Sequence, residues 1–403
     1  MNSMSFPFIT VADPEISAEG GLDPLGLSSI SDRLANSILP GLRARMSRPR
    51  FLTAMAVSAS VCEGQKETAA DDVTSPEIVF EWLLVEAFAR NAAYESSLRT
   101  PGIEKARTCK QTGEPMRAKA YLKNPGVFGL HGVYKPLAVD LGIVDDEFRL
   151  GEAGYALLDT WEQEQNVTGF IDRAHGNGGS LEFGSLIRSA IDDSLKAGQS
   201  RRSPAWQGWS FFTNHLLPAQ PGKKESDLIW RLLLGSSDSL RGEIFQLLAH
   251  GHFEGLTEKD IIEQQLLDRA SPMLKKKLLQ IEAYESFVSA LENAFDWLRY
   301  LSSQAGARAI GVDEFQVVNE ISEIADNLKK LVNCADQELS DATLSIQQDY
   351  TRLASFFSGC TGPQQLYEAI LTRHAEVQKN KPPEGKREWF ERDSSNRVVV
   401  RIH

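Results

Sequence analysis

The sequence predicts a mainly α-helical protein with a winged-helix-like module and a long antiparallel, coiled-coil-like helical hairpin. Hydrophobic residues make up 42% of the 403 residues and charged residues 24%, which is the composition of an ordinary folded protein. From residue 180 onward, helix-length apolar patterns follow one another with few strand-like segments. Over residues 321–357, apolar and small residues recur at steps of three and four, which is typical of helices that pack lengthwise.

The N-terminal third is expected to contain an irregular arm and then a helical domain. Residues 1–30 are rich in Ser, Pro and Gly, so we expect an irregular N-terminal arm there. Residues 31–123 are expected to form a helical domain. Within it, Ser and Pro at positions 75 and 76 are typical of the start of a helix, which we expect over residues 76–97. Residues 99–123 are punctuated by Gly, Pro and Thr, which favours a long basic loop.

Residues 124–170 have the pattern of a winged-helix-like module. A helical stretch over residues 133–141 is followed by a short apolar segment at 142–144, an acidic turn at 145–146 and a second apolar segment at 148–150. A helix bounded by glycine comes next. This order is typical of the wing and last helix of a winged-helix domain. The acidic residues of the turn would repel phosphate, so docking of a protein is at least as well favoured as reading of DNA.

The C-terminal half is expected to be helical, with two unusually long helices. Residues 180–270 are expected to form a domain of shorter helices, and the long helices follow over residues 272–304 and 313–358. The short connection between them favours an intramolecular hairpin over residues 271–358, although an intermolecular coiled coil fits the same heptad pattern. Residues 359–403 are expected to form a basic C-terminal segment with a short helix and a terminal strand.

Basic residues are concentrated near the two ends of the chain. The net charge is −12, from 43 Lys and Arg against 55 Asp and Glu, and the acidic surplus lies in residues 124–359. Closely spaced guanidinium groups suit phosphate oxygens, and an aromatic ring beside them can stack on a base. The alternative is that these cations pair with carboxylates of the chain or of an acidic protein partner. The candidate nucleic-acid-binding residues are Arg43, Arg45, Arg48, Arg50, Lys105, Arg107, Lys110, Arg117, Lys119, Lys381, Lys386, Arg387 and Trp389.

Catalytic and metal-binding patterns are weak in this sequence. His250, His252 and Glu254 offer three ligand types, but a metalloprotease helix needs histidines at positions i and i+4. Histidines beside Gly251 are better explained by the end of a helix. The sequence contains no Gly-x-x-x-x-Gly-Lys-Ser/Thr loop and no Cys-x-x-Cys pair. We therefore expect no metal, no cofactor and no catalytic residue.

The sequence also contains no segment that is typical of membrane targeting. No run approaches the roughly 18 apolar residues of a membrane span, and the first thirty residues lack the basic start and apolar run of a signal peptide. We expect a cytoplasmic protein without a membrane partner.

Three segments near the ends of the chain form a recognisable set. They are Gly21-Leu22-Asp23-Pro24-Leu25-Gly26, then Leu39-Pro40-Gly41 with Arg48-Pro49-Arg50-Phe51, and finally His374-x-x-Val377-Gln378 with Lys381-Pro382-Pro383-x-Gly385-Lys386-Arg387-x-Trp389-Phe390. Together they resemble a poorly characterised group of bacterial proteins that occurs beside restriction and phage-defence genes. The resemblance implies a setting more than a chemistry, because only its Arg and Lys positions transfer, as candidate contacts.

These observations favour a non-enzymatic accessory or adaptor subunit of a bacterial antiphage complex. The winged helix and the hairpin would dock a larger helicase, ATPase or nuclease, and the basic ends would contact DNA. Two alternatives stay open: a metal-dependent nuclease with a dispersed site, and a stand-alone winged-helix DNA-binding regulator.

Overall fold

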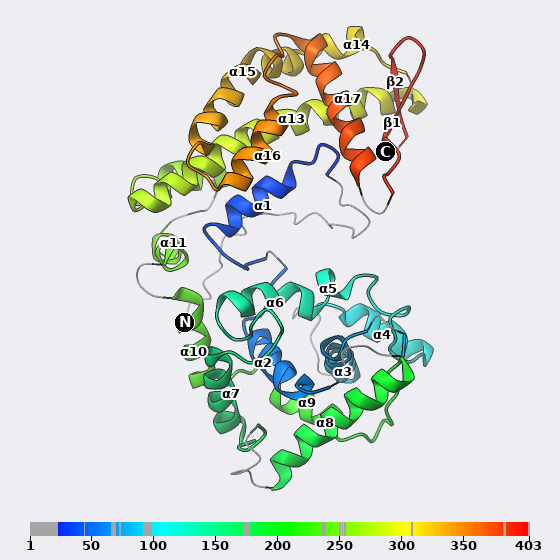
Figure 1. The fold of residues 1–403 in the computed structure, drawn as a ribbon, viewed down its shortest axis with the longest axis vertical. Helices are drawn as coiled ribbons and strands as arrows, with labels where there is room; N and C mark the ends of the chain where they lie inside the picture. Colours follow the sequence, from blue (N-terminus) through cyan, green and yellow to red (C-terminus); the bar gives the residue numbers. More distant parts are fainter. Residues whose placement is uncertain are drawn as a thin grey trace. The chain divides into compact units, whose positions relative to one another are not determined.

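The computed structural model is mainly helical, and its helices pack into two compact units (Figure 1). The predicted mainly α fold class is therefore confirmed. We call Met1–Ile38 with Ile244–His403 the split unit, and Leu39–Glu243 the central unit. No helix among the described residues is both long and apolar enough to cross a membrane. The structure describes residues 23–43, 45–65, 70–71, 74–91, 99–171, 178–235, 239–249, 251, 253, 255–307, 309–381 and 384–401.

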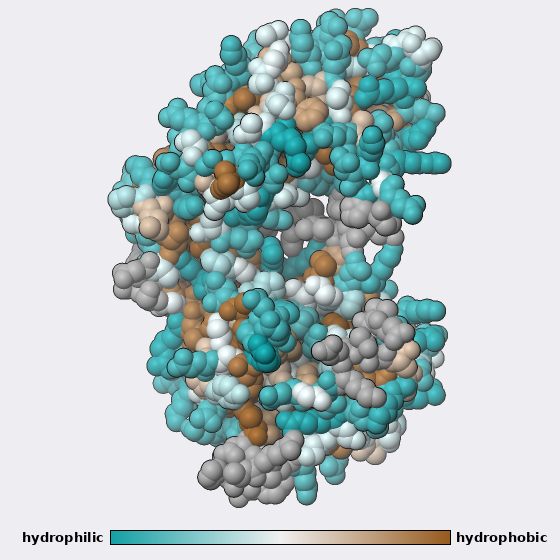
Figure 2. All heavy atoms as spheres, viewed as in Figure 1, coloured by the Kyte–Doolittle hydropathy of each residue, from teal (hydrophilic) through white to brown (hydrophobic). Residues whose placement is uncertain are grey.

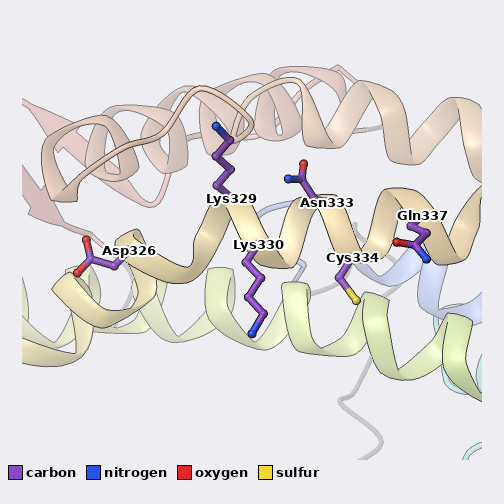
Figure 3. Close-up of a pocket in the computed structure, with 6 residues that line it drawn as sticks. All are labelled: Asp326, Lys329, Lys330, Asn333, Cys334 and Gln337. Atoms are coloured by element: carbon purple, nitrogen blue, oxygen red, sulfur yellow. The ribbon is translucent and has the colours of Figure 1, made fainter.

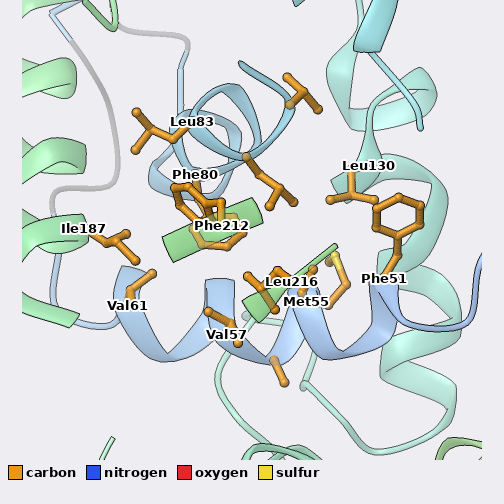
Figure 4. Close-up of a cluster of buried hydrophobic side chains, with 14 of the residues drawn as sticks. Phe51, Met55, Val57, Val61, Phe80, Leu83, Leu130, Ile187, Phe212 and Leu216 are labelled. Atoms are coloured by element: carbon orange, nitrogen blue, oxygen red, sulfur yellow. The ribbon is translucent and has the colours of Figure 1, made fainter. Parts of the chain in front are cut away.

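The central unit is built around two helices that are buried on nearly every side, α2 and α3. Almost all side chains of α2 are apolar or small, so this helix can be enclosed without stranding a large polar group. Figure 4 shows core side chains of α2 facing Phe80 of α3 and Phe212 of α9, whose rings meet edge to face at 5.5 Å between centroids. The helices of this unit are α2 (Phe51–Cys62), α3 (Pro76–Arg90), α4 (Ile103–Thr112), α5 (Pro125–Phe128), α6 (Leu130–Asp140), α7 (Glu152–Gln165), α8 (Gly178–Ala197), α9 (Gly208–His215) and α10 (Lys223–Leu234), and α11 (Leu240–Ala249) spans the boundary between the units.

Two predictions for the N-terminal third need correction. The helix expected over residues 76–97 begins at Pro76, as predicted, but ends at Arg90. The long loop expected over residues 99–123 contains α4. Gly102 and Gly113, both with left-handed φ angles of 79° and 72°, mark its two ends. The two glycines therefore lie at the ends of a helix and do not interrupt one.

The segment between α6 and α7 contains one bridge where two strands were expected. Val144 pairs with Leu150 in an isolated antiparallel bridge, and the Gly151 N–H donates to the Ile143 carbonyl at 2.9 Å. α7 then packs close to this turn, because a Cβ on Gly154 would lie 2.1 Å from the Ile143 oxygen. The described geometry is a helix, a tight turn and a helix.

The split unit combines the start of the chain with its C-terminal part. β1 and β2 pair antiparallel, with Phe390 opposite Val400. Its elements are α1 (Ser28–Asn36), α12 (Glu258–Ile261), the π-helical turn η2 (Ile262–Leu266), α13 (Pro272–Ala307), α14 (Val312–Gln316), α15 (Asn319–Leu339), α16 (Leu344–Ala354), α17 (Pro363–Asn380), β1 (Phe390–Arg392) and β2 (Val398–Val400).

The long helix expected over residues 313–358 is wrong as a continuous element. The chain forms α14, α15 and α16 there, with breaks at residues 317–318 and 340–343. The side chain of Gln347 stabilises the chain at the second break by donating to the carbonyls of Ser340 and Ala342 at 2.7 and 2.8 Å. The heptad positions of α15 are nevertheless all buried: Ile321, Ala325, Leu328, Val332, Ala335 and Leu339.

α13 and α15 lie against each other in opposite directions. Lys276 Nζ lies 2.7 Å from Asp341 Oδ2, and Gln280 Nε2 donates to the Glu338 carbonyl at 3.2 Å. Increasing residue numbers on α13 therefore meet decreasing numbers on α15. Figure 1 shows the two helices side by side in the split unit.

The described end of the expected N-terminal arm is ordered. The Asp23 carboxylate accepts the backbone N–H groups of Leu27 and Ser28, both at 2.9 Å, which satisfies amide donors at the start of α1. Tyr284 of α13 donates its hydroxyl to the Leu27 carbonyl at 2.8 Å. Residues 23–30 thus belong to the split unit, and residues 1–22 lie outside the described residues.

Candidate nucleic-acid interface

α4 presents predicted basic residues on the outside of the central unit. Ile103, Ala106 and Cys109 form its buried face, and α4 packs on α3. Lys105 and Lys110 are exposed on the rest of the helix surface. The amphipathic spacing of α4 therefore determines which side chains reach solvent.

The lysines of this region keep their charge largely uncompensated. Among the described residues, Lys105, Lys110 and Lys119 have no carboxylate within ion-pair distance, and Lys110 Nζ donates to the Ala89 carbonyl at 3.2 Å. Arg107 differs, because it pairs with Glu104 at 2.5 Å on the same helix. Arg117 is exposed and only loosely paired, with its guanidinium 3.9 Å from Glu114.

The basic segment before α2 lies beside the start of α4. The Ser47 hydroxyl donates to the Arg99 carbonyl at 3.3 Å, and Arg99 precedes α4 by a few residues. The Arg45 guanidinium lies 4.7 Å from the ring centroid of Phe128, and Arg43 is exposed. Arg48 is half-exposed. We call these side chains the basic surface: Arg43, Arg45, Arg48, Lys105, Lys110, Arg117 and Lys119.

Arg50 is wrong as a nucleic-acid contact, because it is buried and fully engaged inside the central unit. It is 2% exposed, and its Nε lies 3.0 Å from Glu225 Oε1. Its terminal nitrogens donate to the carbonyls of His215, Leu217 and Gln220. A guanidinium that already fills its donor sites in the core cannot reach a phosphate.

Trp389 is also wrong as a contact, because its ring is in the core of the split unit. It is 8% exposed and packs against Phe295 at 5.7 Å between ring centroids. Lys381 and Lys386 are half-buried and Arg387 is exposed; burial lowers the pKa of Lys381. The C-terminal segment therefore keeps cations at its surface but offers no ring for stacking at Trp389.

His374 joins the N-terminal and C-terminal segments of the split unit, a role that the sequence pattern did not indicate. Its Nδ1 lies 2.9 Å from the Pro24 carbonyl, and its Nε2 accepts the Trp389 N–H at 2.9 Å. The neighbouring Arg373 donates from Nε to the Leu25 carbonyl at 2.8 Å. Burial lowers the pKa of His374 to about 4, so the ring is neutral and can both donate and accept. We call these contacts the His374 clasp.

The clasp brings together two of the three segments that the sequence singled out near the ends of the chain. The described residues of the first and third segments, around Pro24 and Trp389, meet at one imidazole. Gly41 of the second segment has a φ of 71°, and a Cβ there would lie 2.6 Å from the Leu137 Cα. These positions satisfy packing and hydrogen bonds. The sequence did contain a signal for these contacts: a histidine in the C-terminal segment, with glycine and proline residues in both terminal segments.

Glu81, Tyr121 and His131 form a buried polar cluster that caps a helix. Glu81 accepts the Tyr121 hydroxyl at 2.5 Å and the His131 backbone N–H at 2.8 Å, at the start of α6. Burial raises the pKa of Glu81 to about 7 and lowers that of His131 to about 4. A Cβ on Gly129 would lie 2.2 Å from Glu81 Oε1, so the carboxylate is enclosed by backbone. Its geometry is that of a structural cap.

The histidine group considered for metal binding lies largely beyond what the structure describes. His250, His252 and Glu254 are outside the described residues. Within the described part of the chain, no group of three or more His, Cys, Asp and Glu is placed to hold a metal ion.

A shallow hollow on α15 does not bring reactive groups together. It is lined by Asp326, Lys329, Lys330, Asn333, Cys334 and Gln337. Figure 3 shows these side chains diverging from a single helix. Groups that diverge in this way cannot surround a ligand from several sides, so the hollow has the features of an ordinary polar helix face.

Comparison of the chain with protein-family models, with curated proteins and with solved structures finds no match.

Proposed function

We propose that this chain is a non-enzymatic accessory subunit of a bacterial antiphage complex and that it contacts DNA through the basic surface of the central unit. The carrying observation is that Lys105, Lys110 and Lys119 are exposed without a carboxylate partner among the described residues. Cations of this kind attract phosphate and release the counterions that surround DNA. The resemblance of the terminal segments supplies the antiphage setting.

The distribution of charge supports this assignment. A chain with a net charge of −12 is repelled by DNA as a whole, so contact requires a local positive region. The basic surface is such a region, because its three lysines have no carboxylate neighbour among the described ion pairs and Arg117 has only Glu114, at 3.9 Å. The segment that contains Arg43 meets the segment that leads into α4 through the hydrogen bond from Ser47 to the Arg99 carbonyl.

We also propose that the protein docks a larger helicase, ATPase or nuclease in the cytoplasm. α5 to α7 would act as a winged-helix-like module, and α13 with α15 as a hairpin. Large apolar side chains on the split unit support docking: Met273 is 66% exposed and Leu344 is 67% exposed. Both lie near the Lys276–Asp341 ion pair, at one end of the α13–α15 pair. Hydrophilic side chains cover most of the face shown in Figure 2.

Co-purification from the native host tests the proposed function. Tagged full-length wild type would be compared with a Lys105→Glu, Lys119→Glu variant, in low and physiological salt. We expect the wild type to retain a stoichiometric large partner and nucleic acid. We expect the variant to retain the partner but lose most of the nucleic acid, because two charges are reversed at the contact and the net charge there changes by four units.

The matched control is Lys329→Glu with Lys330→Glu, which reverses two exposed lysines on α15 of the split unit. Its nucleic-acid content should equal that of the wild type. Equal nucleic-acid content in all three proteins would contradict the DNA contact, and recovery of the wild type without any partner would contradict the accessory role.

A further inference from the structure

The bridge between the segments after α4 and after α8 positions an arginine that was not among the sequence candidates. Met116 and Ser200 exchange both backbone hydrogen bonds, at 3.2 and 2.7 Å, and each is 1% exposed. Because side chains alternate across an extended backbone, the next residues, Arg117 and Arg201, point outward. Both are exposed. They flank the bridge on its outer face, one on each side.

Arg201 keeps its positive charge available. Its Nη2 donates to the Gly113 carbonyl at 3.3 Å, at the end of α4, and it has no carboxylate within ion-pair distance among the described residues. The neighbouring Arg202 is different, because it pairs with Asp193 at 3.1 Å and donates to the Ala190 carbonyl at 2.7 Å. Arg202 therefore has a structural role, whereas Arg201 adds charge to the surface.

Trp206 adds a supported aromatic ring close to the bridge segment, because the Arg202 guanidinium lies 6.0 Å from its ring centroid. It follows Arg201 by five residues and is half-exposed. A Cβ on Gly208 would lie 2.2 Å from its six-membered ring, so the indole lies directly against the backbone there. Trp209 meets it edge to face at 4.7 Å between centroids. The ring is thus held by the Gly208 backbone, by Trp209 and by the Arg202 guanidinium, while part of it remains in contact with solvent.

We propose that Arg117, Arg201 and Trp206 form a strip that binds single-stranded nucleic acid. The two guanidinium groups would bind phosphates, and one unpaired base would stack on Trp206. A paired base has its faces covered by its neighbours, so this combination suits a single strand better than a duplex. The inference rests on the proposed function and extends the basic surface past the C-terminal end of α4.

The test compares full-length wild type and Trp206→Ala for binding of a fluorescent 20-nucleotide oligothymidylate and of a 20-base-pair duplex, by anisotropy. Removing one stacked base costs roughly tenfold in affinity, so the variant should bind the single strand about ten times more weakly and the duplex within twofold of wild type. Trp230→Ala, at an indole that is 40% exposed elsewhere in the central unit, is the matched control and should bind like wild type.

A second variant keeps the test decisive if Trp206→Ala does not fold. Arg117→Ala with Arg201→Ala changes only exposed side chains, and it should lower the salt slope of single-strand binding by about 1.4, for two phosphates. An unchanged slope, or equal single-strand binding by wild type and Trp206→Ala, would overturn the strip. So would a polyglutamate peptide that binds the wild type as tightly as the oligonucleotide does.

Failure of the strip and failure of the proposed function have different signatures. Loss of duplex binding in Lys105→Glu, Lys119→Glu together with wild-type single-strand binding in the strip variants would overturn the strip alone. A wild type that binds neither nucleic acid would overturn both.

Discussion

Arg50 shows at the scale of one residue how burial separates a structural cation from a surface one. It pairs with Glu225 in the core of the central unit, and Thr53 donates to the same carboxylate oxygen at 2.7 Å. Arg48, two residues earlier, is half-exposed. A double substitution of both arginines would therefore mix a change in stability with a change in binding.

Arg50→Ala should lower the free energy of unfolding by about 3 to 5 kcal/mol, because it leaves the Glu225 carboxylate buried without its partner. Arg48→Ala should change it by less than about 0.5 kcal/mol, because the backbone N–H of residue 48, which donates to Tyr134, is kept. Urea denaturation of the two variants provides the comparison. Equal stability of Arg50→Ala and wild type would contradict the assigned role.

The sequence could not distinguish these two arginines. Both lie in a short basic stretch without acidic residues, and the carboxylate that engages Arg50 is 175 positions away in the chain. The same limitation applies to Trp389, whose ring is covered by Phe295 of a distant helix. Local composition predicts which residues carry charge or a ring, but long-range packing decides which of them stay at the surface.

At the scale of elements, the His374 clasp joins α17 to the N-terminal segment and to the strand that follows. Burial lowers the pKa of His374 from 6.5 to about 4. As the pH falls below 6.5, the unfolded chain binds a proton before the folded one does, so the contribution of this ring to stability is present above pH 6.5 and is lost towards pH 4. Protonation would also remove the acceptor for the Trp389 N–H.

Wild type should therefore lose stability relative to His374→Gln as the pH falls from 6.5 to 4, by at most about 1.4 kcal/mol per pH unit. The glutamine variant lacks the titrating group while keeping polar atoms at the position. Denaturation of both proteins at pH 7.5, 6, 5 and 4 measures the difference. A difference that stays constant over this range would show that His374 does not titrate as the clasp requires.

Elements with a clear period were predictable, and their interruptions were not. The buried positions of α15 follow the heptad pattern, but the same steps of three and four continue across the break at residues 340–343, so the pattern conceals the turn. Around α4 the sequence pattern favoured a loop where the chain forms a helix. Gly102 and Gly113 suggested a loop, whereas their left-handed backbones begin and end a helix.

In the whole molecule, the residues pack into two units and not into the six consecutive segments expected from the sequence. Residues 23–38 pack with the C-terminal part, and Arg373 reaches the Leu25 carbonyl across 348 positions. Such pairings are set by tertiary packing, which single-sequence patterns do not contain. The basic stretch around α4 was predictable from composition, but Arg201 joins it through the bridge between Ser200 and Met116 and through a hydrogen bond to Gly113, which is 88 positions away in the chain.

The salt dependence of DNA binding shows whether the basic surface contacts phosphates. Association of full-length protein with a 20-base-pair duplex would be measured from 50 to 200 mM salt for wild type and for Lys105→Ala with Lys119→Ala. We expect the affinity of the wild type to fall linearly with salt concentration on logarithmic axes, and the slope of the variant to be shallower by about 1.8, because two phosphate contacts are lost. Identical slopes, or an affinity that does not change with salt, would contradict the assignment of the basic surface.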